Sequence, residues 1–506
     1  MAPDPRRQRG LMLLLLLVLT GVLAALVVIN LIPSPAASEV AREEITQKAL
    51  AEAKAALLAY VAASALDQGK WEESYWVPGH LPCPADTSLT QANQEGYSMS
   101  PNCGVRFRSQ VGRLPWKTLR VNPIRDGHGE CLWYAVSGTY KGGTSASAPF
   151  LNWDTPGQFV VLGADGTSRL AGNSAEDRAV VVILAPGPAL AGQVRTVEPN
   201  TGNCPGNHDA ANYLERLASP QASNASPDAT LVDDTTSFWS DGKVSTLISG
   251  PVREGASGRT LLNDRVITIT APEIFDAINQ TVSLVGTTSN PGPLRKMTSA
   301  AGWCMAQLPS RKFPDRPNDR RMLYAGSLSL VPESGAWTQV LSVEQVNAQA
   351  GRFPNYSYTV TGPPQPLDPD WLASCPTSTW TPVISKLYRH WKDHLFYIVA
   401  AEFTRQDTSA NTQCGAGCLS TTAQTKVPAL TILSGRRLGG QLRTRTTDRL
   451  VPANFLEDVN AVRVAHPGTG TTFASGSETP SFNDLLYCID FQTAGGNSRV
   501  PKVDPC

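Results

Sequence analysis

An apolar run near the N-terminus limits what this chain can fold into more than any other feature. Residues 11–32 carry no charged side chain over 22 positions, and Arg6, Arg7 and Arg9 stand just before them. A helix of that length rises about 33 Å, enough to cross the hydrocarbon core of a bilayer. The arginines are expected to stay on the cytoplasmic side. No second run of comparable length occurs later in the chain, so the sequence predicts one membrane crossing with the bulk of the chain outside the cytoplasm.

Three fates of this run are open. A secretory signal would be cut near Ala36, since Ser34 and Ala36 form a small-x-small site, although the run is longer than the usual apolar core of such signals. An uncleaved anchor would keep the whole segment. A leader cut on the cytoplasmic side, between Gly10 and Leu11, would remove only residues 1–10 and leave the run from Leu11 to Ile32 in the mature protein. The basic stretch that ends in Gly10 favours the third fate.

A second helix is predicted directly after the run. Pro33 and Pro35 should interrupt the membrane helix, and Ser34 can cap a restart with Pro35 at its first position. Residues 38–65 are rich in Ala and have high helix propensity. Apolar side chains recur there at helical spacing and predict one buried stripe: Ile45, Ala49, Ala53, Ala56, Leu57, Tyr60 and Val61. Glu44, Lys48 and Glu52 lie at i,i+4 spacing on another face.

This arrangement resembles the N-terminus of type IV pilins and type II secretion pseudopilins. The resemblance implies a leader of residues 1–10 removed by prepilin peptidase after Gly10, methylation of Leu11, and a helix over 11–66 whose second half packs on an antiparallel sheet. It also implies a single-pass inner-membrane protein with its bulk in the periplasm, or in an extracellular filament after assembly. The expected partners are other pilin or pseudopilin subunits, bound through the N-terminal helix.

The chain departs from the family at Leu15, where most pilins carry a Glu that is thought to pair with a neighbour's amino terminus. A charge without a partner is costly inside a membrane, so its absence fits a subunit at the filament tip. It equally fits a protein that does not polymerise.

Further short segments are similar to a group of uncharacterised proteobacterial proteins with prepilin-type N-termini: 79–84, 112–116 and 132–137, with 262–265 and 271–277. This closer resemblance covers residues 9–280 well, the rest loosely, and carries no activity.

Four pairs of short phrases recur in the same order and suggest an internal duplication. They are 132–137 with 395–400, 192–195 with 440–443, 212–215 with 454–457, and 262–264 with 482–484. The first copy would occupy residues 67–280 and the second residues 290–506. Runs of Val, Ile and aromatic residues between turn residues predict strands at 158–163, 179–184, 265–270, 395–401 and 429–433. The fold class expected is therefore α+β, with two β-rich antiparallel units and few long helices beyond residue 66.

The cysteine count agrees with export from the cytoplasm. Ten cysteines, an even number, predict disulfides in a chain whose bulk lies outside the membrane. Spacing alone suggests five pairs: Cys83–Cys103, Cys131–Cys204, Cys304–Cys375, Cys414–Cys418 and Cys488–Cys506. The last pair would be similar to the C-terminal loop closure of many pilins.

Enzymatic, metal and nucleic-acid sites are not expected. Forty-three basic and 43 acidic residues cancel, which argues against a polyanion partner such as nucleic acid. His390 and His394 lack the Glu of a zinc-protease motif, because Trp391 stands in its place. The segment 143–149 is similar to a subtilisin nucleophile signature, with Asp126 and His128 nearby, but the parallel α/β pattern that this chemistry needs is missing. No catalytic residue, metal ligand or cofactor is assigned.

The sequence leaves two hypotheses of function. In the first, the chain is a large minor pilin-like subunit of a type IV pilus or a type II secretion filament, and Leu15 makes the filament tip one candidate position. In the second, it is a membrane-anchored periplasmic binding protein that does not polymerise.

Overall fold

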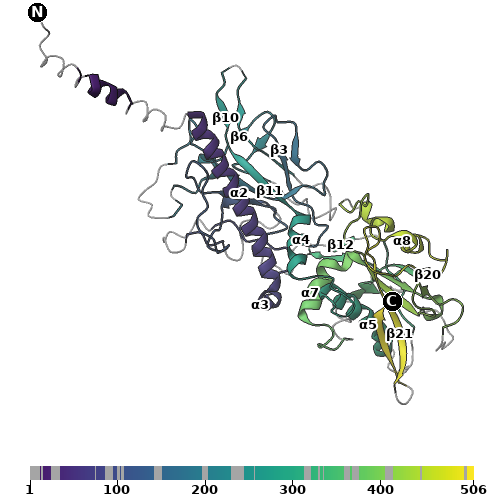
Figure 1. Cartoon of the computed structure of the whole chain (residues 1–506). Coiled ribbons are helices and arrows are strands. Elements are labelled where there is room, and N and C mark those ends of the chain that lie inside the picture. Colours follow the sequence, from purple (N-terminus) through teal and green to yellow (C-terminus); the bar gives the residue numbers. More distant parts are fainter. Residues whose placement is uncertain are drawn as a thin grey trace, which may run out of the picture.

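The fold is α+β, with one long helix near the N-terminus followed by a β-rich remainder of several sheets (Figure 1). The computed structural model describes residues 12, 15–23, 35–73, 76–85, 95–99, 103, 108–141, 151–195, 203–204, 206–228, 244–255, 257–312, 321–328, 331–333, 336–357, 365–366, 375–404, 414–444, 447–494 and 498–506. We call residues 67–280 the middle region and residues 290–506 the C-terminal region.

Helix α2 (Pro35–Leu66) is the long helix, and it begins at the proline predicted for its first position. Its first ten residues are mostly exposed, whereas from Thr46 onward one face is buried. That face lies on strands of the first sheet and on helix α4. Alanine dominates the buried face, and its short side chain lets the helix backbone come close to the strands.

The buried face of α2 confirms most of the stripe predicted from the sequence, since Ala49, Ala53, Ala56, Leu57 and Val61 are buried; the prediction was wrong at Ile45. Ile45 is 51% exposed, whereas Thr46 and Leu50 are buried with Ala49 and Ala53. The prediction counted apolar side chains alone, but the buried face can include a threonine whose hydroxyl is satisfied locally. The Thr46 hydroxyl donates to the Arg42 carbonyl at 2.9 Å and accepts from the Gly127 amide at 3.0 Å.

The first sheet contains seven strands and supports α2. Its path is β1 (Gln110–Arg113), β2 (Trp133–Val136), β5 (Ala179–Ala185), β3 (Phe159–Leu162) and β4 (Arg169–Ala171). β11 (Arg265–Thr270) pairs with β5 in antiparallel fashion, and β8 (Ser245–Ile248) runs parallel to β3. Every residue of β5 is buried, as expected for a central strand covered on both faces.

Helix α4 (Ala271–Thr281) follows β11 without a loop. Thr270 and Glu273 form a capping box at its start, which satisfies two of the amides that a helix N-terminus leaves open. Glu273 also pairs with Lys54 of α2. The capping residue therefore helps to attach the long helix to the end of the sheet.

The second sheet lies in the C-terminal region and has five strands. Its order is β14 (Ala350–Arg352), β17 (Leu395–Val399), β19 (Ala429–Leu433), β21 (Leu485–Ala494) and β22 (Ser498–Pro505), with every pair antiparallel. The strands expected at 158–163, 179–184, 265–270, 395–401 and 429–433 are thus confirmed as β3, β5, β11, β17 and β19.

Helix α5 (Pro293–Lys312) was not predicted, although one helix of 20 residues agrees with the expectation of few long helices beyond residue 66. It contacts β19, β21 and β22 as α2 contacts β5 and β11. Its buried side chains do follow helical spacing, at Leu294, Met297, Ala301 and Met305. Small residues and Gly302 between them weaken the apolar pattern, so packing rather than propensity supports this helix. Helix α7 (Pro382–Trp391) packs against α5 and is capped by Thr381.

The remaining elements are short. They are α3 (Gln68–Glu72), α8 (Asp458–Ala465), β6 (Arg216–Leu217), β7 (Ala222–Ser223), β9 (Val252–Arg253), β10 (Thr260–Leu262), β12 (Val331–Glu333), β13 (Ala336–Leu341), β15 (Tyr356–Ser357), β16 (Gln365–Pro366), β18 (Ser420–Thr421) and β20 (Thr472–Phe473), with 3-10 turns at 210–212, 392–394, 401–403, 448–450 and 452–454.

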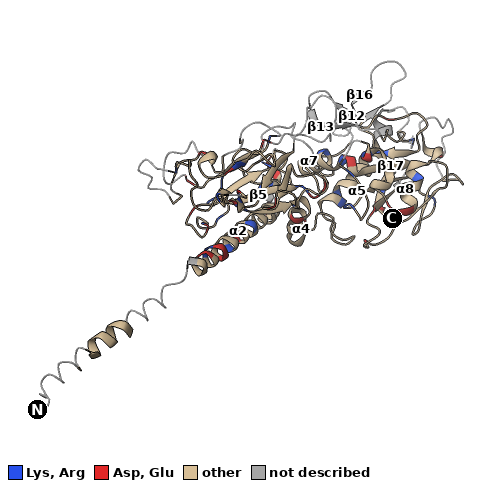
Figure 2. Cartoon of the chain, turned by 90° about the horizontal axis from the view of Figure 1, so that it is seen from above, with Lys and Arg blue, Asp and Glu red and all other residues tan. Residues whose placement is uncertain are grey.

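The C-terminal region lies beyond the C-terminal end of α2, while the N-terminal end of α2 points away from it (Figures 1 and 2). The Lys386 ammonium of α7 donates to the Trp71 carbonyl at 2.6 Å and to the Glu73 carbonyl at 2.5 Å. Trp391 of α7 and Phe275 of α4 meet edge to face, with ring centroids 6.3 Å apart. One buried apolar cluster therefore runs from α2 through α4 and α7 into the second sheet.

We predict that Leu57→Ala destabilises the protein by about 2–5 kcal/mol, because a fully buried leucine on α2 would leave a cavity against the sheet. Ile45→Ala, which truncates an exposed residue of the same helix, is the control and should change stability by less than about 0.5 kcal/mol. Urea unfolding of the detergent-solubilised protein measures both. Equal effects of the two substitutions would contradict the assigned packing face.

Candidate functional site

The N-terminal residues assigned to processing fall mainly outside the described part of the chain. Gly10, Leu11 and Ile32 are not described. Leu15 lies in a helical segment, residues 15–23, and is 65% exposed. All the large apolar side chains of that segment are exposed, from Leu15 to Leu23. A helix that is apolar on all sides needs lipid or other helices around it.

One described helix, Ala36–Leu66, is long and apolar enough to cross a membrane by length and composition. It corresponds to α2, and nearly half of its most apolar stretch is buried inside the protein. Its outer face is charged, with Lys48 and Glu44 paired at 2.7 Å (Figure 2). We therefore interpret α2 as the helix that attaches the sheets to the preceding apolar run, and not as the membrane crossing itself.

All ten cysteines form disulfides, in the five pairs that their spacing suggested. They join Cys83 to Cys103, Cys131 to Cys204, Cys304 to Cys375, Cys414 to Cys418 and Cys488 to Cys506, with Cα atoms 5.2–5.7 Å apart. Such bonds persist in oxidising compartments, which supports a location of this part outside the cytoplasm.

A buried cluster of hydrogen-bonded side chains closes the end of the first sheet, and we call it the first polar cluster. Its centre is a pair of carboxyl groups. Asp264 Oδ2 accepts from the Glu215 amide at 3.1 Å and from Asn224 Nδ2 at 2.8 Å. Glu215 in turn accepts from the Asn263 amide at 3.0 Å and from Gln193 Nε2 at 2.6 Å. The four contacts bring together the loops that follow β5, β7 and β10.

The second sheet carries the same arrangement, which we call the second polar cluster. Asp484 Oδ2 accepts from the Glu457 amide at 3.1 Å and from Asn460 Nδ2 at 2.9 Å. Glu457 accepts from the Asn483 amide at 3.0 Å and from Gln441 Nε2 at 3.0 Å. The two clusters thus use the same residue types, atoms and contacts, 200 or more residues apart.

Each polar cluster also contains an arginine, and the two clusters differ in the acid with which this arginine forms an ion pair. Arg195 and Arg443 donate to equivalent groups, the carbonyls of Gly187 and Gly435, at 2.7 and 2.9 Å. Arg195 pairs with Glu130 of its own region at 3.2 Å. Arg443 instead pairs at 3.1 Å with an acid of the middle region, Asp154, and so joins the second cluster to the first sheet.

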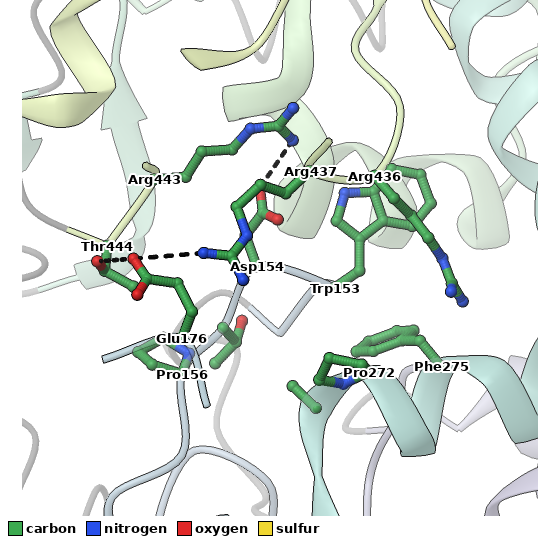
Figure 3. A pocket seen from close by; sticks show the side chains of 12 residues that line it. Trp153, Asp154, Pro156, Glu176, Pro272, Phe275, Arg436, Arg437, Arg443 and Thr444 are labelled. Carbon is green, nitrogen blue, oxygen red and sulfur yellow. Dashed lines mark hydrogen bonds and ion pairs between the residues drawn. The ribbon is translucent and has the colours of Figure 1, made fainter. Parts of the chain in front are cut away.

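Asp154 lines a small cavity at this junction, shown in Figure 3, and the pocket has a volume of about 160 Å³. Glu176 lies on the same wall, 3.5 Å from Arg437 of the loop after β19. Trp153 and Phe275 form the apolar side of the cavity. The volume is below the 300–1,000 Å³ typical of small-molecule sites, and its acids are paired with arginines. We call this contact the inter-sheet seam and interpret it as structural.

His394 lies at the base of the seam and is fully buried. Burial lowers its pKa to about 4, although Asp393 and Asp154 act in the opposite direction. The ring is therefore neutral at neutral pH, and its Nε2 lies 3.2 Å from Asp154 Oδ2 without a hydrogen bond between them. Its Nδ1 faces the Ser434 hydroxyl at 2.8 Å. The other histidine of the i,i+4 pair, His390, accepts from the Leu151 amide at 3.0 Å.

The residues weighed as enzymatic or metal-binding have structural contacts. Asp126 Oδ1 accepts from the amides of His128 and Glu130, at 2.8 and 3.0 Å, and closes a turn. The serine-rich segment 143–149 lies outside the described residues. Within the described ranges no group of three or more His, Cys, Asp or Glu side chains is placed to hold a metal ion.

Comparisons with known proteins give no further assignment. No protein-family model matches the chain, and no match was found among curated proteins or solved structures.

The paired carboxyls make stability depend on pH. Burial, and then repulsion from Glu215, raise the pKa of Asp264 well above its ordinary value, so the folded state binds a proton that the unfolded chain releases. Burial, and then repulsion from Glu457, likewise raise the pKa of Asp484 well above its ordinary value. This stabilisation is complete below about pH 4 and is lost as the pH rises through the raised pKa, by up to about 1.4 kcal/mol per pH unit and group.

We expect Asp264→Asn together with Asp484→Asn to reduce this loss of stability as the pH rises above about pH 4, because a neutral amide replaces the protonated acid. Urea unfolding as a function of pH measures the slope. The control is Asp165→Asn: amides of Thr167 and Ser168 lower the pKa of this exposed acid to about 2, so its contribution changes only at lower pH. An unchanged slope in the double variant would assign the pH dependence to other groups.

The seam yields a second prediction. Asp154→Ala should destabilise the protein by about 3–5 kcal/mol, since Arg443 would remain as a buried charge without its acid. Glu176→Ala should lower the free energy of unfolding by less, because its partner Arg437 is about one-third exposed. Chemical unfolding of both variants tests the order, and a larger loss in Glu176→Ala would contradict the assigned role of Asp154.

Proposed function

We propose that the chain is a minor pilin- or pseudopilin-like structural subunit of a type IV pilus or type II secretion filament. The observation that carries the proposal is the division of the N-terminal helices into two kinds of surface. Residues 15–23 are helical, apolar and exposed, whereas α2 buries one face on the antiparallel strands β5 and β11. An apolar helix that its own protein leaves uncovered is suited to bundle with similar helices, and α2 suits a stalk.

The proposal includes an internal duplication, with copies over residues 67–280 and 290–506. Strands β1, β2, β5 and β11 pair in the order of β14, β17, β19 and β21. The registers of the equivalent strand pairs also agree. Trp133 of β2 lies opposite Leu184 of β5, and Phe396 of β17 lies opposite Ile432 of β19. The two polar clusters supply an independent set of equivalent contacts. In this interpretation α5 is the second copy's equivalent of α2, shortened because it has no membrane to reach.

A position at the filament tip fits two features. Leu15 replaces the Glu that most pilins use toward the next subunit's amino terminus, and a terminal subunit has no such neighbour. The C-terminal region lies at the end of α2 that points away from the apolar run (Figure 1). Other subunits would contact residues 11–66, prepilin peptidase would cut after Gly10, and the C-terminal region would be presented at the greatest distance from the membrane.

A single-span periplasmic binding protein that does not polymerise is the second candidate. Leu15 favours it as well, since the electrostatic contact used in pilin assembly is absent in both cases. Under this alternative the same apolar run is a lipid anchor, and the two sheet regions form a rigid head held by the seam. Processing distinguishes the two proposals because only a prepilin loses residues 1–10.

We predict that the mature protein begins at Leu11 and that Gly10→Val prevents this cleavage, since a branched side chain would replace the residue preceding the cut. N-terminal mass spectrometry of membrane-extracted protein measures the start, with and without prepilin peptidase. Gly21→Val is the matched control: no heavy atom lies within 4 Å of a Cβ placed there, so cleavage should proceed. An intact N-terminus in the parent chain, or one near Ala36, contradicts the proposal.

A further inference from the structure

A groove in the C-terminal region is larger than the seam cavity and differs from it in charge. It lies between the first half of α5, the start of α7 and the last two strands, β21 and β22. Its volume is about 660 Å³, within the range of small-molecule sites. These elements lie together in the C-terminal region (Figure 1).

The electrostatics of the groove favour an anion. Arg295 and Lys296 line it, and no Asp or Glu is among the described residues of its wall. Both adjoining helices also begin at the groove, α5 at Pro293 and α7 at Pro382. Two helix N-termini add positive potential to that of the two side chains. By contrast, each arginine at the seam cavity has an acidic partner.

The other walls combine hydroxyl groups with apolar surface. Trp303 is partly exposed on the same face of α5 as Lys296 and Ser299. Val383 and Val503 supply an apolar floor. Five serine and threonine side chains surround it: Thr288, Ser299, Ser378, Thr379 and Thr381. A ligand with many hydroxyls and some apolar C–H surface fits such walls, because both its polar and apolar faces find partners.

Disulfides hold the walls in place. Cys304–Cys375 joins α5 to the segment that leads into Thr379 and α7, and Cys488–Cys506 joins β21 to the C-terminus next to Pro505. A site whose walls are already fixed loses less entropy on binding. The groove is therefore a preformed cavity with two separate crosslinks around it.

We propose that this groove binds an acidic saccharide, with its carboxylate at Arg295 and Lys296 and its hydroxyls on the serine and threonine side chains. The positive charge selects the acid, and the hydroxyl-rich wall with Trp303 selects a sugar over a simple anion. The proposal does not depend on filament assembly, since an anchored protein that never polymerises would present the same groove.

The test uses the full-length protein in detergent and titration calorimetry with tetragalacturonate as the probe. Maltotetraose is the neutral probe of the same length, and inorganic phosphate is the simple-anion competitor. We expect tetragalacturonate to bind, maltotetraose to bind at least about tenfold more weakly, and Lys296→Gln and Arg295→Gln each to weaken tetragalacturonate binding about tenfold or more. Arg389→Gln, an exposed arginine of α7 outside the groove, is the matched control and should bind normally.

Each other outcome overturns the proposal. These are no binding of tetragalacturonate, binding that both variants retain, equal binding of maltotetraose, or displacement by phosphate at equal concentration. Thermal unfolding of each variant checks that the variant is still folded. Lys296 has an exposed side chain, so Lys296→Gln decides the question if Arg295→Gln fails to fold.

Discussion

The packing of α2 on the first sheet is the contact on which the rest of the architecture depends. An alanine-rich face lets the helix lie close to β5 and β11, and the charged groups around it fix its position. Arg265 of β11 pairs with Glu43 at 2.8 Å, and Lys54 donates to the Thr268 carbonyl at 2.9 Å. Beyond the helix, the carbonyls of Trp71 in α3 and of Glu73 then accept hydrogen bonds from Lys386 of α7. One helix therefore sets the position of both sheets and the direction in which the apolar run leaves the protein.

The fold was largely predictable where a local signal exists. Long Val and Ile runs identified β5 and β11, and the phrases 395–401 and 429–433 identified β17 and β19. Helix α5 was missed because its burial depends on β19, β21 and β22, which lie more than 100 residues later in the chain. The error at Ile45, which is exposed while Thr46 and Leu50 are buried, has the same origin, since only the shape of the sheet decides where the buried face of an alanine-rich helix ends.

Residues of the two polar clusters occur in the recurring segments of the sequence, but the sequence did not predict that their side chains form a hydrogen-bond network. The recurring phrases contain Gln193 and Glu215 with Gln441 and Glu457, which are the side chains that meet at each sheet end. Their repetition reflects a shared hydrogen-bond network, because a buried acid needs every one of its donors. Asp154 and Glu176 had no such signal. They lie in irregular loops, and their arginine partners follow β19 more than 250 residues later.

The distribution of the disulfides has a mechanical consequence. Helix α2 contains no cysteine, so none of the five crosslinks fastens it to the sheets. A pulling force applied along the apolar run would load the helix against β5 and β11 in shear, and non-covalent contacts alone would resist it. If that contact gave way, the helix would detach first, and tension would next reach the loop closed by Cys83 and Cys103. The crosslinked sheets behind it would keep their shape while the helix yields.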